Sequence, residues 1–272
     1  MPSKHLIALD LDGTLLTDDK TISARSKQAI EKAKAYGHIV AISTGRPVRA
    51  SLNYYRELGL TSPMVNFNGA FVHNPDAPSF GSYHSPLDLK TAKTVIETCE
   101  AFRVSNIMVE VMDDFYLRYK DELFVEAFTA GQNPIDYGNL LNILQDAPTS
   151  VLIHPQYDQA ESLRDLLKKA HAEVIEQRVW GAPWNIIEVI RAGVNKAVGL
   201  KRISDYYGIP SERIIAFGDE DNDLEMLEFA GQGVAMGNAI PELKSVANHI
   251  TLTNEEDGIA EYLEEALNLS VK

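Results

Sequence analysis

Short runs of apolar residues alternate with segments of helical periodicity in the first and last thirds of the chain. Residues 6–9 are apolar at every position, a pattern typical of a strand that is buried on both faces of a parallel sheet. Residues 214–217 repeat this pattern near the other end of the chain. Because strands that alternate with helices indicate βαβ units, the sequence predicts an α/β core with a Rossmann-like parallel sheet.

Turn and cap residues set the expected limits of these elements. Ser23 is a good N-cap for a helix, Gly37 is placed to end that helix, and Pro47 suits the first turn of the next one. The pattern predicts core strands at 6–10, 39–42, 64–67, 214–217, 233–236 and 249–252. It predicts core helices at about 23–36, 47–58, 195–207, 222–229, 241–247 and 258–267.

The middle of the chain has a different pattern, in which strands follow one another through tight turns. Residues 107–111 and 115–119 are separated by two aspartates and predict a hairpin. Further strands are expected at 151–154, 173–176 and 184–190, with helices at 88–102 and 159–170. We therefore expect a core domain of residues 1–83 and 191–272, into which an α+β domain of residues 84–190 is inserted.

Composition narrows the possible partners and the compartment. The 272 residues include 39 acidic and 25 basic ones, and the net charge of −14 argues against nucleic acid as a partner because phosphate contacts need a basic face. The longest segment without a formal charge, 58–75, is interrupted by Gly, Pro and Asn and predicts no membrane span. With the single cysteine Cys99 and no signal-peptide pattern, we expect a cytoplasmic protein.

Acidic residues follow two of the predicted buried strands. Asp10 and Asp12 come at the end of the first strand, where the alternation of side chains can direct both to one side, and Asp219 follows the strand at 214–217. Neighbouring carboxylates that lose water are costly unless a cation or hydrogen bonds compensate. Because ligands of open α/β sheets bind at the carboxyl ends of the strands, these residues predict one metal site built from distant parts of the chain.

Two further segments favour an anion beside that metal. Thr44 and Gly45 precede the helix expected to begin near Pro47, whose free N–H groups and the Thr44 hydroxyl would together bind an anion. Lys196 opens another predicted helix, where a cation is unfavourable for the helix dipole unless an anion lies next to it. Oxygen ligands favour Mg²⁺ over Zn²⁺. A hard cation beside an anion site indicates phosphoryl transfer.

At these positions the chain resembles the haloacid dehalogenase (HAD) phosphatases. The four matching motifs, in chain order, are Asp10-Leu11-Asp12-Gly13-Thr14, Thr44, Lys196 and Gly218-Asp219-x-x-Asn222-Asp223. The inserted domain resembles the C2b-type cap of the Cof-type sugar-phosphatase branch, subclass IIB. Ala197 follows the lysine where many relatives have glycine, and alanine is a good helix former.

The resemblance implies a Mg²⁺-dependent phosphomonoester hydrolase that acts on small phosphorylated metabolites, sugar phosphates above all. Asp10 would be the nucleophile that forms an aspartyl-phosphate, and Asp12 the general acid and base. The Mg²⁺ ligands would be Asp10, the backbone carbonyl of Asp12, Asp219 and Asp223. The residues that hold the phosphoryl group would be Leu11, Thr44, Gly45, Lys196 and Asn222.

Several alternatives stay open. A phosphomutase or phosphotransferase would use the same aspartyl-phosphate, and a non-catalytic phosphometabolite-binding protein could retain the same fold. The spacing Asp219-x-Asp221-x-Asp223 also resembles the start of an EF-hand loop, but Leu224 and Ala230 stand where that loop needs glycine and glutamate. Neither the metabolite nor the oligomeric state follows from the motifs.

Overall fold

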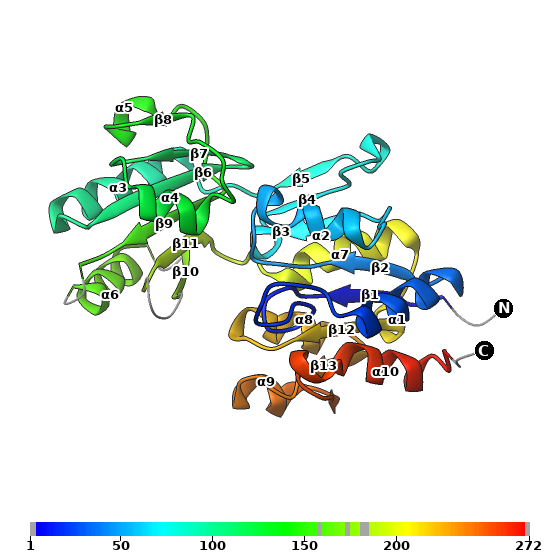
Figure 1. The fold of residues 1–272 in the computed structure, drawn as a ribbon. Coiled ribbons are helices and arrows are strands. Elements are labelled where there is room, and N and C mark those ends of the chain that lie inside the picture. The colour runs from blue at the N-terminus through cyan, green and yellow to red at the C-terminus, as the bar shows by residue number, and fades with distance from the viewer. Residues whose placement is uncertain (1–3, 157–158, 172–174, 180–184, 270–272) are drawn as a thin grey trace. The chain divides into compact units, whose positions relative to one another are not determined.

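The computed structural model describes residues 4–156, 159–171, 175–179 and 185–269. The chain forms two compact units (Figure 1). The core unit consists of Met1–Arg46, Ser51–Tyr83 and Asn195–Lys272, and the second unit of Pro47–Ala50 and His84–Val194. Within the described residues, none of the helices combines the length and the apolar character that a membrane span requires.

A five-stranded parallel sheet forms the centre of the core unit, as the alternation of strands and helices predicted. Its order is β14-β13-β12-β1-β2, and every neighbouring pair is parallel. Both β1 and β12 are buried along their whole length, which explains their uninterrupted apolar sequence. The strands are β1 (Leu6–Leu9), β2 (Ile39–Ile42), β12 (Ile214–Gly218), β13 (Gln232–Ala235) and β14 (His249–Ile250).

The helices of the core unit follow the strands in the predicted sequence. Ser23 caps α1, since its Oγ accepts a hydrogen bond from the N–H of Ser26 at 3.1 Å. Helix α1 packs on α10, and α7 packs on α8. The helices are α1 (Ala24–Ala35), α2 (Leu52–Glu57), α7 (Lys196–Tyr207), α8 (Leu224–Phe229), α9 (Pro241–Val246) and α10 (Gly258–Ala266).

The sheet has a topological switch point between the parallel strands β1 and β12. From β1 the chain continues to β2 on one side, whereas β12 is followed by β13 and β14 on the other side. Such a switch point leaves a crevice at the carboxyl ends of the two central strands, because the connections that follow them leave in opposite directions. Asp10 and Asp219 come directly after the ends of these two strands.

Two predicted elements of the core unit differ in the structure. The helix expected from Pro47 is wrong at its start, because a 3-10 turn at Val48–Ala50 comes first and α2 begins at Leu52. The backbone N–H of Arg49, within this turn, donates to Asp113 Oδ1 at 2.8 Å, and both residues belong to the second unit. The helix expected from Asn222 likewise begins with a 3-10 turn, Asp221–Asp223.

The strand predicted at 64–67 lies outside the parallel sheet, in a small three-stranded sheet. It is β3 (Met64–Asn66), which pairs with β4 (Phe71–His73) in the order β3-β4-β5, with β5 at Ser82–His84. Its link to the end of β2 is a single parallel bridge between Ser43 and Val65. Strands β4 and β5 were not predicted, since three-residue strands are too short for a recognisable alternation.

A six-stranded sheet of order β10-β11-β9-β6-β7-β8 forms the second unit. The hairpin predicted around Asp113 and Asp114 is confirmed as the antiparallel pair β6–β7. Parts of the strands predicted at 173–176 and 184–190 lie outside the described residues. The strands are β6 (Asn106–Val111), β7 (Asp114–Leu117), β8 (Asp136–Tyr137), β9 (Ser150–His154), β10 (Ile175–Val179) and β11 (Ile187–Arg191); the helices are α3 (Leu89–Phe102), α4 (Glu122–Phe128), α5 (Leu140–Ile143) and α6 (Ala160–His171).

A buried ion pair holds the segment Pro47–Ala50 in the second unit. The Arg49 side chain is fully buried, forms a salt bridge with Glu110 and lies 4.8 Å above the ring of Phe115. The other oxygen of the Glu110 carboxylate accepts a hydrogen bond from Ser150 Oγ at 2.6 Å. The residues directly after Thr44-Gly45-Arg46 are therefore anchored by charges that have no access to water.

We expect Arg49→Met to lower the free energy of unfolding by about 3–5 kcal/mol, because it leaves the Glu110 carboxylate buried without its cation. Arg118→Met is the matched control in the same unit, since Arg118 pairs with Glu100, lies 4.5 Å above Tyr119 and is partly exposed. Its cost should stay near or below ~1 kcal/mol. Thermal unfolding followed by circular dichroism compares them, and equal shifts in Tm would contradict the prediction.

Candidate functional site

Four side chains from distant parts of the core unit meet at the switch point. Asp10 follows β1, Asp219 follows β12, Asp223 ends the 3-10 turn before α8, and Lys196 is the first residue of α7. All four are buried. The structure therefore brings together four of the predicted site residues, and it does so because the two central strands end side by side.

Lys196 is held between two carboxylates. Its Nζ lies 2.7 Å from Asp10 Oδ1 and 2.7 Å from Asp223 Oδ1, and its side chain has no exposed surface. Burial alone would lower the pKa of Lys196, but the charges and hydrogen bonds of Asp10 and Asp223 outweigh burial and raise the pKa. These two carboxylates explain how a cation is tolerated at the first position of a helix.

Three carboxylates form a group that could hold a cation. Ligand oxygens of Asp10, Asp219 and Asp223 all lie within 4.8 Å of one another. Thr14 orients one of them, because its Oγ1 donates to Asp219 Oδ1 at 2.6 Å. Gly13 is required beside it, since its φ is +70° and a Cβ there would overlap the Asp219 carboxylate.

The carboxylates of this group repel one another in the absence of a cation. Burial raises the pKa of Asp10 well above its ordinary value, Lys196 opposes the shift, and the charges of Asp223 and Asp219 add to it. Burial also raises the pKa of Asp219 to about 7, opposed by the hydrogen bond from Thr14. A divalent cation would reverse these shifts, because its charge stabilises the deprotonated carboxylates.

Asp12 has a different set of partners. Its carboxylate accepts hydrogen bonds from Arg46 Nε and Nη2, both at 2.6 Å, and from Lys20 Nζ at 2.9 Å. Burial alone would raise the pKa of Asp12, but the hydrogen bonds and charges of Arg46 and Lys20 lower it to about 2. Strand β1 ends at Leu9, so the strand alternation behind the expected common direction of Asp10 and Asp12 does not extend to Asp12, and that common direction stays a prediction.

Thr44 and Gly45, two of the predicted phosphoryl-binding residues, lie in the loop that follows β2. Thr44 is buried, and its Oγ1 accepts a hydrogen bond from the backbone N–H of Arg46 at 3.1 Å. Because α2 begins at Leu52, the predicted helix N-terminus behind Thr44 and Gly45 is wrong, and their N–H groups belong to a loop. The side chain of Leu11 is buried in the core.

Several residues of this region were not predicted. Arg46 and Lys20 hold Asp12, Thr14 orients Asp219, and Asn68 Oδ1 accepts a hydrogen bond from Asn222 Nδ2 at 3.0 Å. Arg46 and Thr14 stand inside or beside the quoted motifs, so their position was a usable signal. Lys20 and Asn68 lie outside the motifs, and only the folded chain brings them near.

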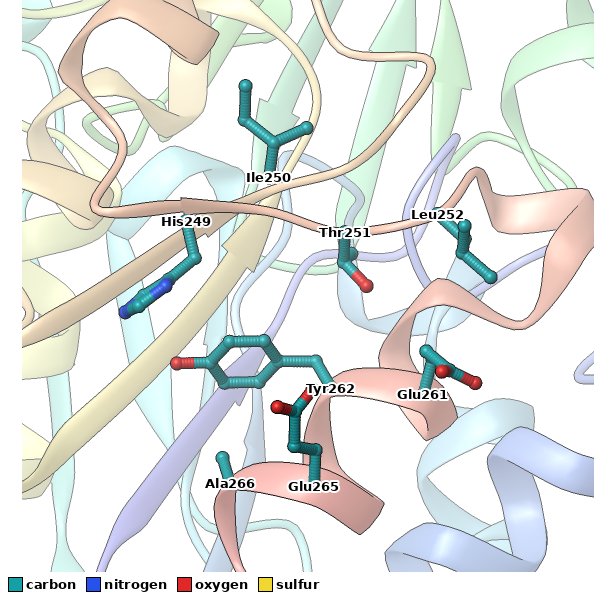
Figure 2. Close-up of a pocket in the computed structure, with 8 residues that line it drawn as sticks. All are labelled: His249, Ile250, Thr251, Leu252, Glu261, Tyr262, Glu265 and Ala266. Atoms are coloured by element: carbon teal, nitrogen blue, oxygen red, sulfur yellow. The ribbon is translucent and has the colours of Figure 1, made fainter.

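The core unit also has a hollow that is lined by none of the site residues described above. It has a volume of about 460 Å³ and is lined by residues of β14, the segment after it and α10 (Figure 2). Tyr262 crosses it, with its ring 5.4 Å from that of His249 and its hydroxyl donating to Gln232 Oε1 at 2.8 Å. None of the predicted site residues lines this hollow.

Comparison with known proteins gives a consistent result over the whole chain. Residues 7–263 match the haloacid dehalogenase-like hydrolase family. The chain is 54% identical over 265 residues to the 5-amino-6-(5-phospho-D-ribitylamino)uracil phosphatase YitU of Bacillus subtilis (strain 168), and the alignment covers 97% of this chain and 98% of that protein.

Solved structures agree with the sequence relatives. A haloacid dehalogenase-like hydrolase from Bacteroides thetaiotaomicron superposes with a TM-score of 0.84 at 27% identity, covering 97% of this chain and 100% of that one. A subclass IIB sugar phosphatase superposes with a TM-score of 0.83 at 24% identity, covering 98% of this chain and 100% of that one. At that identity the second likeness concerns the fold alone.

Proposed function

Because this chain belongs to the haloacid dehalogenase-like hydrolase family, we propose that it is a Mg²⁺-dependent phosphatase that cleaves phosphomonoesters of small metabolites. The observation that carries the proposal is the buried group of Asp10, Asp219 and Asp223 around Lys196 at the switch point of the sheet. Carboxylates in that place combine a nucleophile with ligands for a hard cation.

The donor set fits Mg²⁺. It consists of carboxylate oxygens. The three carboxylates carry more negative charge than the single positive charge of Lys196 balances, so a further cation would neutralise the remainder. Asp10, Asp219 and Asp223 would hold the ion together with the backbone carbonyl of Asp12. When bound, Mg²⁺ would neutralise charge on the transferring phosphoryl group and keep Asp10 deprotonated.

The residues of the chain account for both chemical steps. An oxygen of Asp10 attacks phosphorus, the ester P–O bond breaks, and the leaving alkoxide takes a proton from Asp12. Asp12 then removes a proton from water, whose oxygen attacks the aspartyl-phosphate and releases inorganic phosphate and free Asp10. Leu11, Thr44, Gly45, Lys196 and Asn222 would hold the phosphoryl group during both steps.

Asp12 must change partners during this cycle. In the structure it is ionised and held by Arg46 and Lys20, and a carboxylate with a pKa of about 2 is a poor proton donor near neutral pH. Weakening of these contacts when an anionic substrate attracts the guanidinium would raise the pKa of Asp12 toward the value that a general acid needs.

We assign the insertion, residues 84–190, the role of a C2b-type cap that covers the substrate and excludes water. Support comes from the alignment of a subclass IIB sugar phosphatase over nearly the whole chain. The acidic net charge and the single cysteine favour a small metabolite in the cytoplasm over nucleic acid as substrate.

The substrate that we propose is 5-amino-6-(5-phospho-D-ribitylamino)uracil. The relative that is 54% identical over almost the full length of both chains bears this activity in its name. Its phosphate sits on an open-chain sugar alcohol, which agrees with the sugar phosphates expected from the Cof-type resemblance.

Phosphate release from a panel of phosphorylated metabolites tests the proposal. The panel contains the proposed substrate, sugar phosphates and pyridoxal phosphate, each with Mg²⁺ and with a chelator. We expect the highest kcat/KM for the proposed substrate and no release with the chelator. Transfer of phosphate to a second sugar without free phosphate would instead identify a phosphotransferase or mutase, and no turnover would favour a binding protein.

We expect Mg²⁺ to raise the Tm more at pH 8 than at pH 6. Since the pKa of Asp219 is raised to about 7, the folded protein keeps a proton that the unfolded chain releases above about pH 4, so stability without metal falls as the pH rises through this window. Saturating Mg²⁺ compensates the deprotonated group and should add about 5 °C at pH 8. Differential scanning fluorimetry measures this, with Asp219→Asn as the variant that loses the rise; an equal rise at both pH values would contradict it.

A further inference from the structure

A strained turn lies next to the carboxylate group. It follows β3 and has three consecutive residues with positive φ: Phe67 at 50°, Asn68 at 52° and Gly69 at 98°. Positive φ is uncommon outside glycine, and a run of three persists only where the surroundings hold it in place. Asn68 is the side chain best suited to such a position, since asparagine tolerates the left-handed region.

Backbone hydrogen bonds connect this turn to the loop that contains Thr44, Gly45 and Arg46. The backbone N–H of Asn68 donates to the Thr44 carbonyl at 3.1 Å, and the N–H of Phe67 donates to the Arg46 carbonyl at 3.3 Å. The Asn68 carboxamide lies against Gly45, where a Cβ would come within 3.1 Å of its Oδ1. Asn68 is buried and lies beside Thr44 and Gly45, two of the residues that are proposed to bind the phosphoryl group.

The same turn reaches two other segments of the site. Asn222 Nδ2 donates to Asn68 Oδ1 at 3.0 Å, across 154 positions of sequence. Gly69 packs against the backbone that precedes Lys196, since a Cβ on Gly69 would overlap the Asn195 carbonyl oxygen. One turn thus contacts the segments that supply Thr44, Asn222 and Lys196.

We propose that Asn68 is a positioning residue for phosphate binding, which acts through Asn222 and the Thr44–Gly45 loop. This inference rests on the proposed phosphatase function. The left-handed backbone places the carboxamide between Gly45 and Asn222, and the carboxamide oxygen orients the Asn222 amide. A turn with a purely structural role would need only the backbone conformation, and glycine would satisfy that need equally well.

Asn68→Gly removes the side chain and keeps the backbone conformation, because glycine adopts the same positive φ without strain. The variant therefore tests the side chain alone. We expect about a tenfold weaker inhibition by inorganic phosphate and about a tenfold higher KM, the effect of one hydrogen bond in a site. Asn268→Gly is the matched control, an exposed asparagine with φ 50° at the end of α10, and should behave as wild type. Wild-type values for Asn68→Gly would overturn the proposal.

A double-mutant cycle tests whether Asn68 acts through Asn222. If it does, Asn68→Gly combined with Asn222→Ala should be little worse than Asn222→Ala alone. If the losses of phosphate affinity in the two single variants multiply in the double variant, Asn68 does not act through Asn222. Should Asn68→Gly fail to fold, Asn68→Asp takes its place, because aspartate tolerates the same φ and keeps an oxygen for Asn222. Because it keeps that hydrogen bond, its KM and its inhibition by phosphate should stay near the wild-type values, and a tenfold loss in both would overturn the proposal.

The affinity for inorganic phosphate in the presence of Mg²⁺, measured by isothermal titration calorimetry, tests the positioning role without turnover. A wild-type protein without phosphatase activity would contradict the proposed function, yet a weaker phosphate affinity in Asn68→Gly would still support the positioning role. Equal affinities of wild type and variant would overturn that role even in an active enzyme.

Discussion

Asp10→Asn should abolish phosphate release and leave the folded protein at least as stable as wild type. Asp10 is the proposed nucleophile, and an amide in its place cannot form the aspartyl-phosphate, so turnover should fall by on the order of 10³-fold or more. The stability argument rests on the raised pKa of Asp10: burial raises it most, Lys196 opposes the shift, and the charges of Asp223 and Asp219 add to it. A neutral amide of the same shape removes that repulsion, and Lys196 keeps Asp223 as its partner.

Two measurements on purified protein separate these effects. Phosphate release under saturating Mg²⁺ reports turnover, and thermal unfolding at pH 8 without metal reports stability. Asp165→Asn, an exposed position on α6, is the matched control and should leave both unchanged. Residual turnover near the wild-type value would show that Asp10 is not the nucleophile, and a large fall in Tm would contradict the electrostatic argument.

Lys196→Met should have the largest effect on stability of the substitutions considered for this site. It removes a fully buried ammonium group that lies 2.7 Å from each of two buried carboxylates. Leaving these charges without their cation should cost about 3–5 kcal/mol of unfolding free energy. Phosphatase activity should fall as well, on the order of 10²-fold, because the proposed phosphoryl contact is lost.

The double variant Asp10→Asn with Lys196→Met distinguishes stability from chemistry. It removes one buried anion together with the cation, so we expect it to recover part of the lost stability and none of the activity. The Tm of the single variant Lys196→Met should also rise as the pH falls below about 7, since protonation of Asp219 and Asp10 relieves the repulsion. A Tm of Lys196→Met that is close to wild type at pH 8 would contradict the charge balance described for this site.

The fold and the central site could largely be predicted because their signals are local. Uninterrupted apolar runs identify β1 and β12 as buried strands, and helices between them imply a parallel sheet. Once these strands are neighbours, residues that follow their ends must meet, which places Asp10 beside Asp219 without knowledge of any other contact. The confirmed family membership follows from the same motifs.

Other features depended on partners that a linear pattern does not contain. The segment where the helix was expected to begin forms a 3-10 turn, in which Arg49 is bound to Asp113 and Glu110, more than 60 positions away in the sequence. Strand β3 pairs with two strands too short to show a period. The pKa of Asp12 is low because Arg46 and Lys20 converge on it, although nothing in the motif distinguishes it from Asp10 in this respect.

The sequence by itself determined the order of the strands and helices of the parallel sheet, the residues at the strand ends and the kind of chemistry that they support, since each of these depends on periodicity and spacing within a few residues. The tertiary structure decided which charges pair, how far each carboxylate is buried and that a strained turn at Phe67–Gly69 connects three segments of the site. Pairing and burial depend on distances between residues that can be more than 200 positions apart, and such distances exist only after the chain has closed its core.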